Sequence, residues 1–318
     1  MTDSERHIMK EEVREGLLAP QKRLPCKYFY DAHGSYLFEQ ICLQPEYYQT
    51  RTELSILETA APVVITDLKP DILIEFGPGN IQKAKVLLNA LRHVKKGARY
   101  IPVDVCQPVL ESAARDVTAL YPDMTVLPVI ADFTASCEIP PAEGRKLIIF
   151  LGSTIGNLGD AEALAFLLRV SRLMGPEDSF LLGADMLKPK DVLEAAYNDR
   201  CGITAEFNCN ILRNVNRQLG AHFDLSFFDH VAFYNDDRRQ IEMHLKANRD
   251  MEVMIDALGL TITLARDETI FTELCRKYSR ADIEMLAGSA GLTITRWFND
   301  PKEWFSLVEL ALPDHRER

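Results

Sequence analysis

The pattern of hydrophobic and polar positions changes twice along this 318-residue chain. Between about residues 71 and 187, short apolar runs alternate with longer stretches that have the spacing of amphipathic helices. The predicted strands are "DILIEF", "ARYIPVDV", "MTVLPVIADF", "KLIIFLGST" and "SFLLGADML", which begin at residues 71, 98, 124, 146 and 179. Apolar strands separated by helices predict a parallel sheet that is covered on both faces.

The alternation stops near residue 188 and returns near residue 277. Residues 189–219 have the pattern of two successive helices, and residues 228–274 have that of meandering antiparallel strands. After a further helix, "LTITRWFND" and "WFSLVELAL" predict an antiparallel pair. We therefore predict an α/β fold in which a doubly wound sheet is interrupted by an α+β insertion. The predicted domains are 52–187 plus 277–318 for the sheet, and 1–51 plus 188–276 for the second domain.

Composition limits the class of protein. Hydrophobic residues make up 47% and charged residues 26%, as in a soluble globular enzyme. A net charge of -11 without a basic stripe argues against a nucleic-acid partner. No signal peptide or membrane-length apolar run is readable, and the seven cysteines contain no CxxC pair. We expect a cytoplasmic monomer with reduced thiols, no membrane partner and a small-molecule substrate.

A glycine turn follows the first apolar strand. In "ILIEFGPGN", Gly77 and Gly79 would let a ligand approach the backbone at the carboxyl end of the strand. The following helix would present free N–H groups there. The third glycine of a dinucleotide-binding turn is replaced by Gln82, so a nicotinamide dehydrogenase is the less favoured alternative.

Acidic residues end the neighbouring strands. Asp104 could accept both ribose hydroxyls, and Asp132 could accept from an adenine amino group beside the ring of Phe133. Glu75, next to the turn, could meet a ligand's ammonium group. Each acid alone could be a cap or a turn residue, but together they favour S-adenosylmethionine, an adenosine with an amino-acid tail.

Longer motifs carry a resemblance to a known family. They are "YFYDAHGSYLFEQI", "PEYYQTRTE", "EFGPGN", "FLGSTIGNL", "AYNDRCGITAEFNCNIL", "QIEMHL", "FTELCRKY" and "WFSLVEL". With them the chain resembles the amino-acid Nα-methyltransferases that include the histidine-specific enzyme of ergothioneine biosynthesis. The resemblance implies a class I methyltransferase fold, S-adenosylmethionine as cofactor, and methylation of the L-histidine α-amino group to trimethylhistidine (hercynine).

The resemblance also implies roles for individual residues. The implied cofactor-binding residues are Gly77, Lys83, Asp104, Asp132 and Phe133. The implied substrate-binding residues are Tyr47, Asn157, Tyr197, Glu273 and Cys275. Asn157 and Tyr197 would anchor the amino-acid backbone, and with Tyr30 near the methyl donor they form the expected catalytic set. Glu273 would accept from an imidazole N–H.

Some alternatives stay open at the level of sequence. Asn157 could instead cap a helix, the tyrosines could be packed aromatics, and Glu273 could face water. Cys275 stands where the family often has serine, so tryptophan or another aromatic amino acid or amine is an alternative substrate. A third alternative is a protein that binds the cofactor but catalyses no reaction.

The histidines carry no expected chemistry. None of the seven forms a metal-ligand pattern, and no metal is expected. His33, His222 and His230 lie in turns or polar contexts and are expected at the surface.

Overall fold

The computed structural model describes residues 3–133, 139 and 143–313. The chain divides into two compact units. The first, here called the sheet unit, comprises Gln49–Lys188 and Arg276–Arg318; the second, the insertion unit, comprises Met1–Tyr48 and Pro189–Cys275. The chain therefore leaves the sheet unit after Lys188 and re-enters it at Arg276.

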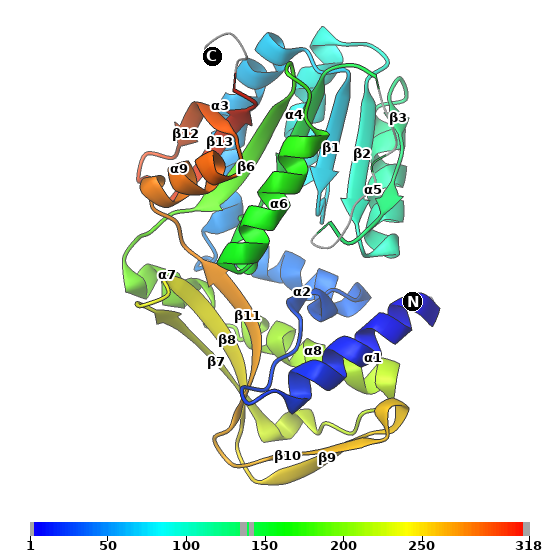
Figure 1. Cartoon of the computed structure of the whole chain (residues 1–318), viewed down its shortest axis with the longest axis vertical. Coiled ribbons are helices and arrows are strands. Elements are labelled where there is room, and N and C mark those ends of the chain that lie inside the picture. Colours follow the sequence, from blue (N-terminus) through cyan, green and yellow to red (C-terminus); the bar gives the residue numbers. More distant parts are fainter. Residues whose placement is uncertain (1–2, 134–138, 140–142, 314–318) are drawn as a thin grey trace. The chain divides into compact units, whose positions relative to one another are not determined.

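Eight strands of the described residues form one sheet in the sheet unit (Figure 1). They are β1 (Ile72–Phe76), β2 (Arg99–Asp104), β3 (Thr125–Val126), β4 (Val129–Ile130), β5 (Lys146–Phe150), β6 (Ser179–Asp185), β12 (Thr293–Asn299) and β13 (Phe305–Ala311). The order is β12-β13-β6-β5-β1-β2-β3, and β4 also pairs with β2. Strands β6, β5, β1 and β2 are parallel, whereas β13 is antiparallel to both β6 and β12. The order reverses between β1 and β5, which is where ligands bind in open α/β sheets.

Helices cover both faces of this sheet because its central strands are apolar on both sides. The helices are α3 (Gln49–Leu68), α4 (Gln82–Val94), α5 (Gln107–Leu120), α6 (Asp160–Leu173) and α9 (Arg280–Ser289). Leu73 and Leu147 pack with α3, α4 and α5, whereas Ile74 and Phe150 pack with α6 and α9. Successive residues of a strand point to opposite faces, so each strand contributes to both cores. The predicted α/β fold is confirmed.

One predicted strand is wrong in detail. Residues 124–133 were expected to form a single strand, but β3 and β4 have two residues each and are separated by Leu127 and Pro128. Proline has no N–H to donate to a neighbouring strand, so it interrupts the ladder.

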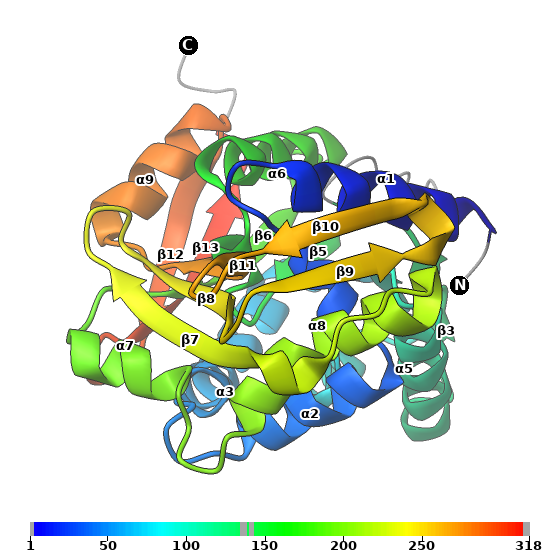
Figure 2. The same ribbon diagram turned by 90° about the horizontal axis from the view of Figure 1, so that it is seen from below.

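The insertion unit contains helices and two small groups of strands (Figure 2). Its helices are α1 (Asp3–Leu18), α2 (Ala32–Cys42), α7 (Lys190–Ala196) and α8 (Ile203–Leu219), with 3-10 turns at Cys26–Phe29, Leu225–Phe227 and Asp256–Leu258. Strands β11 (Thr269–Arg276), β8 (Gln240–Ala247) and β7 (Phe228–Asn235) form a sheet in that order. Strands β9 (Met251–Ile255) and β10 (Leu260–Leu264) form a separate antiparallel ribbon. Both helices predicted in residues 189–219 are present.

Within residues 3–133, 139 and 143–313, no helix is both long enough and apolar enough to cross a bilayer.

Candidate active site

The glycine turn lies at the carboxyl end of β1. Gly77 and Gly79 have positive φ angles of 65° and 54°, a region that glycine enters without steric cost. The Gly77 N–H donates to the carbonyl oxygen of Val103 on β2, 2.9 Å away. A β-carbon at Gly79 would have no atom within 4 Å, so the backbone is open to a ligand there.

Two predicted acids follow the neighbouring strands at the same edge. Asp104 ends β2, and its register partner Ile130 ends β4, two residues before Asp132. One carboxylate oxygen of Asp104 accepts from the backbone N–H of Cys106 at 2.8 Å, which fixes the side chain. Burial raises the pKa of Asp104. This edge therefore offers the open turn and the carboxylates that an adenosine ligand needs.

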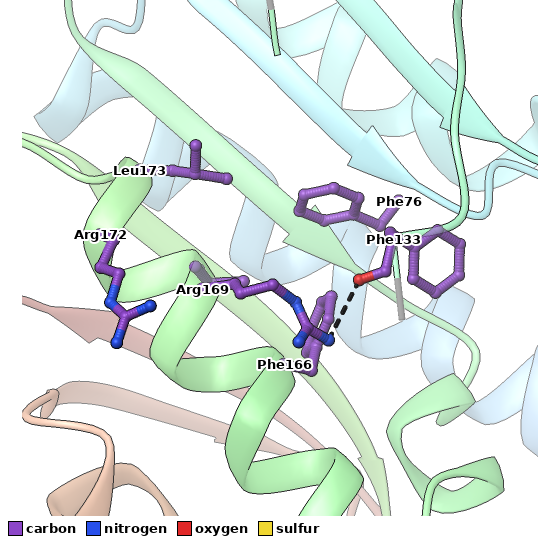
Figure 3. A pocket seen from close by; sticks show the side chains of 7 residues that line it. Phe76, Phe133, Phe166, Arg169, Arg172 and Leu173 are labelled. Atoms are coloured by element: carbon purple, nitrogen blue, oxygen red, sulfur yellow. Dashed lines mark hydrogen bonds between the residues drawn. The ribbon is translucent and has the colours of Figure 1, made fainter. Parts of the chain in front are cut away.

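Phe133 packs on core aromatic rings beside this edge. Its ring centroid lies 5.5 Å from that of Phe150 and 5.7 Å from that of Phe76. A hollow of about 190 Å³ is lined by Phe76, Phe133, Phe166, Arg169, Val170, Arg172 and Leu173. In Figure 3 the Arg169 guanidinium group points at the Phe133 carbonyl oxygen, to which it donates at 3.3 Å.

Two buried carboxylates stand near Lys83, which lies in the first turn of α4. The Lys83 ammonium group is 2.6 Å from a carboxylate oxygen of Glu53. The Tyr100 hydroxyl of β2 donates to the Glu75 carboxylate. Burial raises the pKa of Glu75 to about 7, against the opposing effects of this hydrogen bond and of the Lys83 charge.

Asn157 ends the 3-10 turn Thr154–Asn157, which follows β5. Ser153 before this turn has a φ of 55°, and its hydroxyl accepts from the Asp185 N–H at 2.9 Å. The alternative role of Asn157 as a helix cap does not hold, because the N-cap of α6 is Gly159. The turn instead holds the amide at the carboxyl end of a central strand.

The three predicted tyrosines lie in one aromatic cluster of the insertion unit. The rings of Tyr47 and Tyr197 are 6.5 Å apart between centroids. Phe38 connects them to Tyr30, at 6.1 Å from Tyr47 and 5.8 Å from Tyr30. Burial, with Tyr197 next in effect, raises the pKa of Tyr47 well above its usual value. The Tyr47 phenol therefore stays protonated and can donate a hydrogen bond.

Glu273 and Cys275 lie two residues apart on β11, so they project from the same side of the strand. Glu273 is half-buried and Cys275 is buried. Cys275 is close enough to Tyr47 to affect its pKa. Of the predicted substrate residues in the insertion unit, Tyr47 thus lies after α2, Tyr197 directly after α7, and Glu273 and Cys275 on β11.

Comparison with known proteins decides the family. A family model described as "Histidine-specific methyltransferase, SAM-dependent" matches residues 9–312. The chain belongs to this family. It is 43% identical over 305 residues to the "Histidine N-alpha-methyltransferase" of Mycolicibacterium smegmatis, covering 96% of this chain and 95% of the relative. It is also 29% identical to the "Ergothioneine biosynthesis protein 1" of Neurospora crassa, covering 87% of this chain and 32% of that protein.

Solved structures agree on the fold. An S-adenosylmethionine-dependent methyltransferase from Clostridium acetobutylicum superposes with a TM-score of 0.51 at 11% identity, covering 89% of this chain and 99% of the other. The predicted class I methyltransferase fold, family and S-adenosylmethionine cofactor of this SAM-dependent methyltransferase are therefore confirmed.

Sequence reasoning missed a polar network behind Tyr197 in this histidine-specific methyltransferase. His230 was expected at the surface, as were His33 and His222, but its side chain is half-buried on β7. Its Nε2–H donates to the Tyr197 carbonyl oxygen at 2.9 Å, and its Nδ1 accepts from the Asn208 amide at 2.9 Å. Burial lowers the pKa of His230 and so favours this neutral form. His230 stands two residues after the buried Phe228 in the strand-like run Phe228–Asn235, and this alternation was the available sequence signal.

Proposed function

We propose that the chain transfers methyl groups from S-adenosylmethionine to the α-amino nitrogen of L-histidine, yielding trimethylhistidine (hercynine) for ergothioneine biosynthesis. The match to a histidine-specific family over residues 9–312 carries this proposal. The relatives' names, "Histidine N-alpha-methyltransferase" and "Ergothioneine biosynthesis protein 1", support the acceptor atom and the pathway. The chain has the carboxylates and tyrosines that the family's site needs, and this argues against a cofactor-binding protein that catalyses no reaction.

The cofactor would lie at the carboxyl edge of the sheet. We assign its binding to Gly77, Lys83, Asp104, Asp132 and Phe133. When bound, S-adenosylmethionine supplies an electrophilic methyl group. Asp104, which is held in place by the Cys106 N–H, would accept from ribose hydroxyls, and Lys83 would meet the carboxylate of the amino-acid tail.

The amino-acid substrate would be held by Tyr47, Asn157, Tyr197, Glu273 and Cys275. We assign Asn157 and Tyr197 to its backbone amine and carboxylate, and Tyr30 to the vicinity of the methyl donor. Methyl transfer needs a neutral amine whose lone pair is aimed at the methyl carbon, so most of the catalysis is positioning. Phenol and amide contacts suit this better than carboxylates would, because an amine that gains methyl groups loses its N–H donors.

Glu273 would select the side chain. A half-buried carboxylate on β11 accepts from an imidazole N–H, and a site built around such a bond rejects analogues that lack the donor. We expect kcat/KM for histidine to exceed that for phenylalanine by at least about a hundredfold. Glu273→Ala should erase most of this gap. Cys275→Ser should keep or modestly improve histidine activity, because a hydroxyl is a stronger hydrogen-bond partner than a thiol.

The test incubates the purified protein with labelled S-adenosylmethionine and each of the twenty amino acids, and follows product mass. We expect histidine to gain three methyl groups. Histamine, which lacks the α-carboxylate, should be a poor acceptor. A preference for tryptophan, or a ranking unchanged by Glu273→Ala, would show that histidine is the wrong substrate.

We also infer that the enzyme works as a cytoplasmic monomer without a nucleic-acid partner. The net charge of -11 supports the last point, because phosphate backbones bind basic surfaces. Sedimentation of the purified protein at assay concentration measures its oligomeric state.

A further inference from the structure

Glu53 of α3 is a carboxylate with no exposed surface in the sheet unit. Its two oxygens accept from the backbone N–H of Gly152, at 2.7 and 2.9 Å. One of them also lies 2.6 Å from the Lys83 ammonium group. No sequence pattern indicates this role, since a glutamate in an amphipathic helix is usually exposed.

The surrounding backbone is shaped around this carboxylate. A β-carbon at Gly183 on β6 would lie 2.2 Å from a Glu53 oxygen, so only glycine leaves room for the carboxylate there. Gly152 has a φ of 78°, and a β-carbon on it would lie 2.9 Å from the Lys83 nitrogen. The ammonium group therefore sits directly over the turn that ends β5.

Stability alone does not require such an arrangement. Burying a charged pair costs desolvation free energy that its attraction often only balances, and apolar residues of similar volume can serve as well. The pair does fix geometry, because an ammonium group has three N–H donors and the Glu53 bond sets the direction of the other two. The Lys83 side chain keeps 20% of its surface exposed, which leaves it within reach of a ligand.

The same carboxylate holds the turn that leads to Asn157. Gly152 is followed by Ser153, in the left-handed region, and then by Thr154–Asn157. We propose that Glu53 is a positioning residue, which fixes the Lys83 ammonium group and the 152–153 turn where cofactor binding needs them. This inference rests on the proposed role of Lys83 in holding the cofactor.

The test compares Glu53 with a matched carboxylate at the other end of β5. Asp178 is 4% exposed and accepts from the backbone N–H groups of Lys146 and Gly175 and from the Lys146 ammonium group. Parallel strands have their amino ends at the edge opposite to the glycine turn, so Asp178→Asn removes a similar ion pair away from the cofactor. Glu53→Gln keeps one acceptor oxygen for Gly152, but loses the charge and the second acceptor oxygen.

The measurement is the affinity for S-adenosylhomocysteine by calorimetry, together with the melting temperature. Both variants should melt lower than the parent. Glu53→Gln should weaken binding at least tenfold, and Asp178→Asn should stay within twofold. Lys83→Met should weaken binding in the parent but change it less than twofold in the Glu53→Gln background, because the two residues act as one unit.

A Glu53→Gln affinity within twofold of the parent, with the same loss of melting temperature as Asp178→Asn, would overturn the proposal. If Glu53→Gln does not fold, Glu53→Asp replaces it: the shorter carboxylate cannot reach Gly152 and Lys83 together, and an unchanged affinity is again decisive against the role. Calorimetry needs no turnover, so an error in the amino-acid substrate does not affect the result. Failure of the parent to bind would overturn the cofactor assignment as well.

Discussion

At the scale of single residues, the cofactor edge depends on carboxylates that differ in environment. The Asp104 carboxylate is held by the backbone N–H of Cys106, and a backbone hydrogen bond from Val105 also acts on it. Asp104→Ala should weaken S-adenosylmethionine binding by about 1.5–3 kcal/mol, as expected for a lost hydrogen bond to a charged group. Calorimetry on the folded variant measures this.

Asp300 provides the control for Asp104. Its carboxylate accepts from the N–H groups of Lys302, Trp304 and Phe305 in the same unit, in a loop between β12 and β13. Asp300→Ala should lower stability and leave cofactor affinity unchanged. Equal affinities for the parent and Asp104→Ala would remove Asp104 from the site.

Glu75 should make stability depend on pH. Its pKa of about 7 in the folded protein lies above the ordinary value of 4.5. The folded state therefore binds more protons between these values, and the stability present below pH 4.5 is lost as pH rises through 7. Glu75→Gln stays neutral and can still accept from Tyr100, so it should be more stable than the parent at pH 8 by about 3 kcal/mol.

Urea unfolding at pH 5 and pH 8 tests this prediction. The stability gained by Glu75→Gln should be small at pH 5 and large at pH 8. The same difference at both pH values would mean that Glu75 does not titrate in this range.

At the scale of secondary structure, a polar network joins four elements of the insertion unit. Asn208 of α8 bonds His230 of β7, and its amide oxygen accepts from the Thr272 hydroxyl of β11 at 2.7 Å. His230 in turn holds the carbonyl of Tyr197, the residue after α7. His230→Ala would leave that carbonyl and the Asn208 amide without this partner, at a cost of about 1–3 kcal/mol.

The same substitution should raise KM for histidine and leave cofactor affinity unchanged, because Tyr197 is the proposed substrate contact. His222→Ala is the matched control: His222 is exposed and pairs with Asp256 at 3.2 Å, so its loss should change stability by less than about 0.5 kcal/mol. An unchanged KM in a destabilised His230→Ala would assign the network to folding only.

Helices and strands could be predicted from the sequence where their apolar positions repeat regularly. Runs such as Ile72–Phe76 and Ser179–Asp185 are buried along their whole length and gave clear strands. Pro128 signals a break in residues 124–133, because proline cannot donate to the ladder, but the apolar residues on both sides of it give the pattern of one continuous strand. Side-chain contacts over long sequence distances were not predictable: nothing local shows that Glu53 meets Gly152, or that His230 is turned inward toward Tyr197.

The residues of the candidate site also differ in how far the sequence pattern alone predicts them. Strand-end positions such as Asp104 followed from the pattern, because carboxyl ends of parallel strands share one edge. The tyrosine positions came only through family resemblance, since single aromatics in helices and turns usually pack in cores. The rings of Phe38 and Phe207 pack against Tyr30. Both residues lie within family motifs, but the sequence alone assigns no role to them.

At the scale of the whole molecule, a buried charge cluster ties the two chain segments where the insertion leaves and returns. Asp185 accepts from the Lys188 ammonium group and lies 2.7 Å from that of Lys277, and all three side chains have no exposed surface. Burial acts to raise the pKa of Asp185, but the two lysines outweigh it and lower the pKa. Lys188 and Lys277 flank the insertion of residues 189–275.

Asp185→Asn should destabilise the protein by about 3–5 kcal/mol, because it leaves two buried ammonium groups without this carboxylate. Asp191→Asn, at an exposed position on α7, should have little effect. Chemical unfolding at pH 7 measures both. Similar stabilities for the two variants would show that the cluster contributes little.

The place of β13 in the sheet also determines the order in which the protein can fold during synthesis. Strand β6 pairs with β13, which is made more than a hundred residues later, after the whole insertion has been synthesised. Until then β6, apolar on both faces, has an unpaired edge that could pair with another chain. A nascent chain that stalls between β6 and β13 would therefore be prone to aggregate, although most of its methyltransferase sheet has already been made.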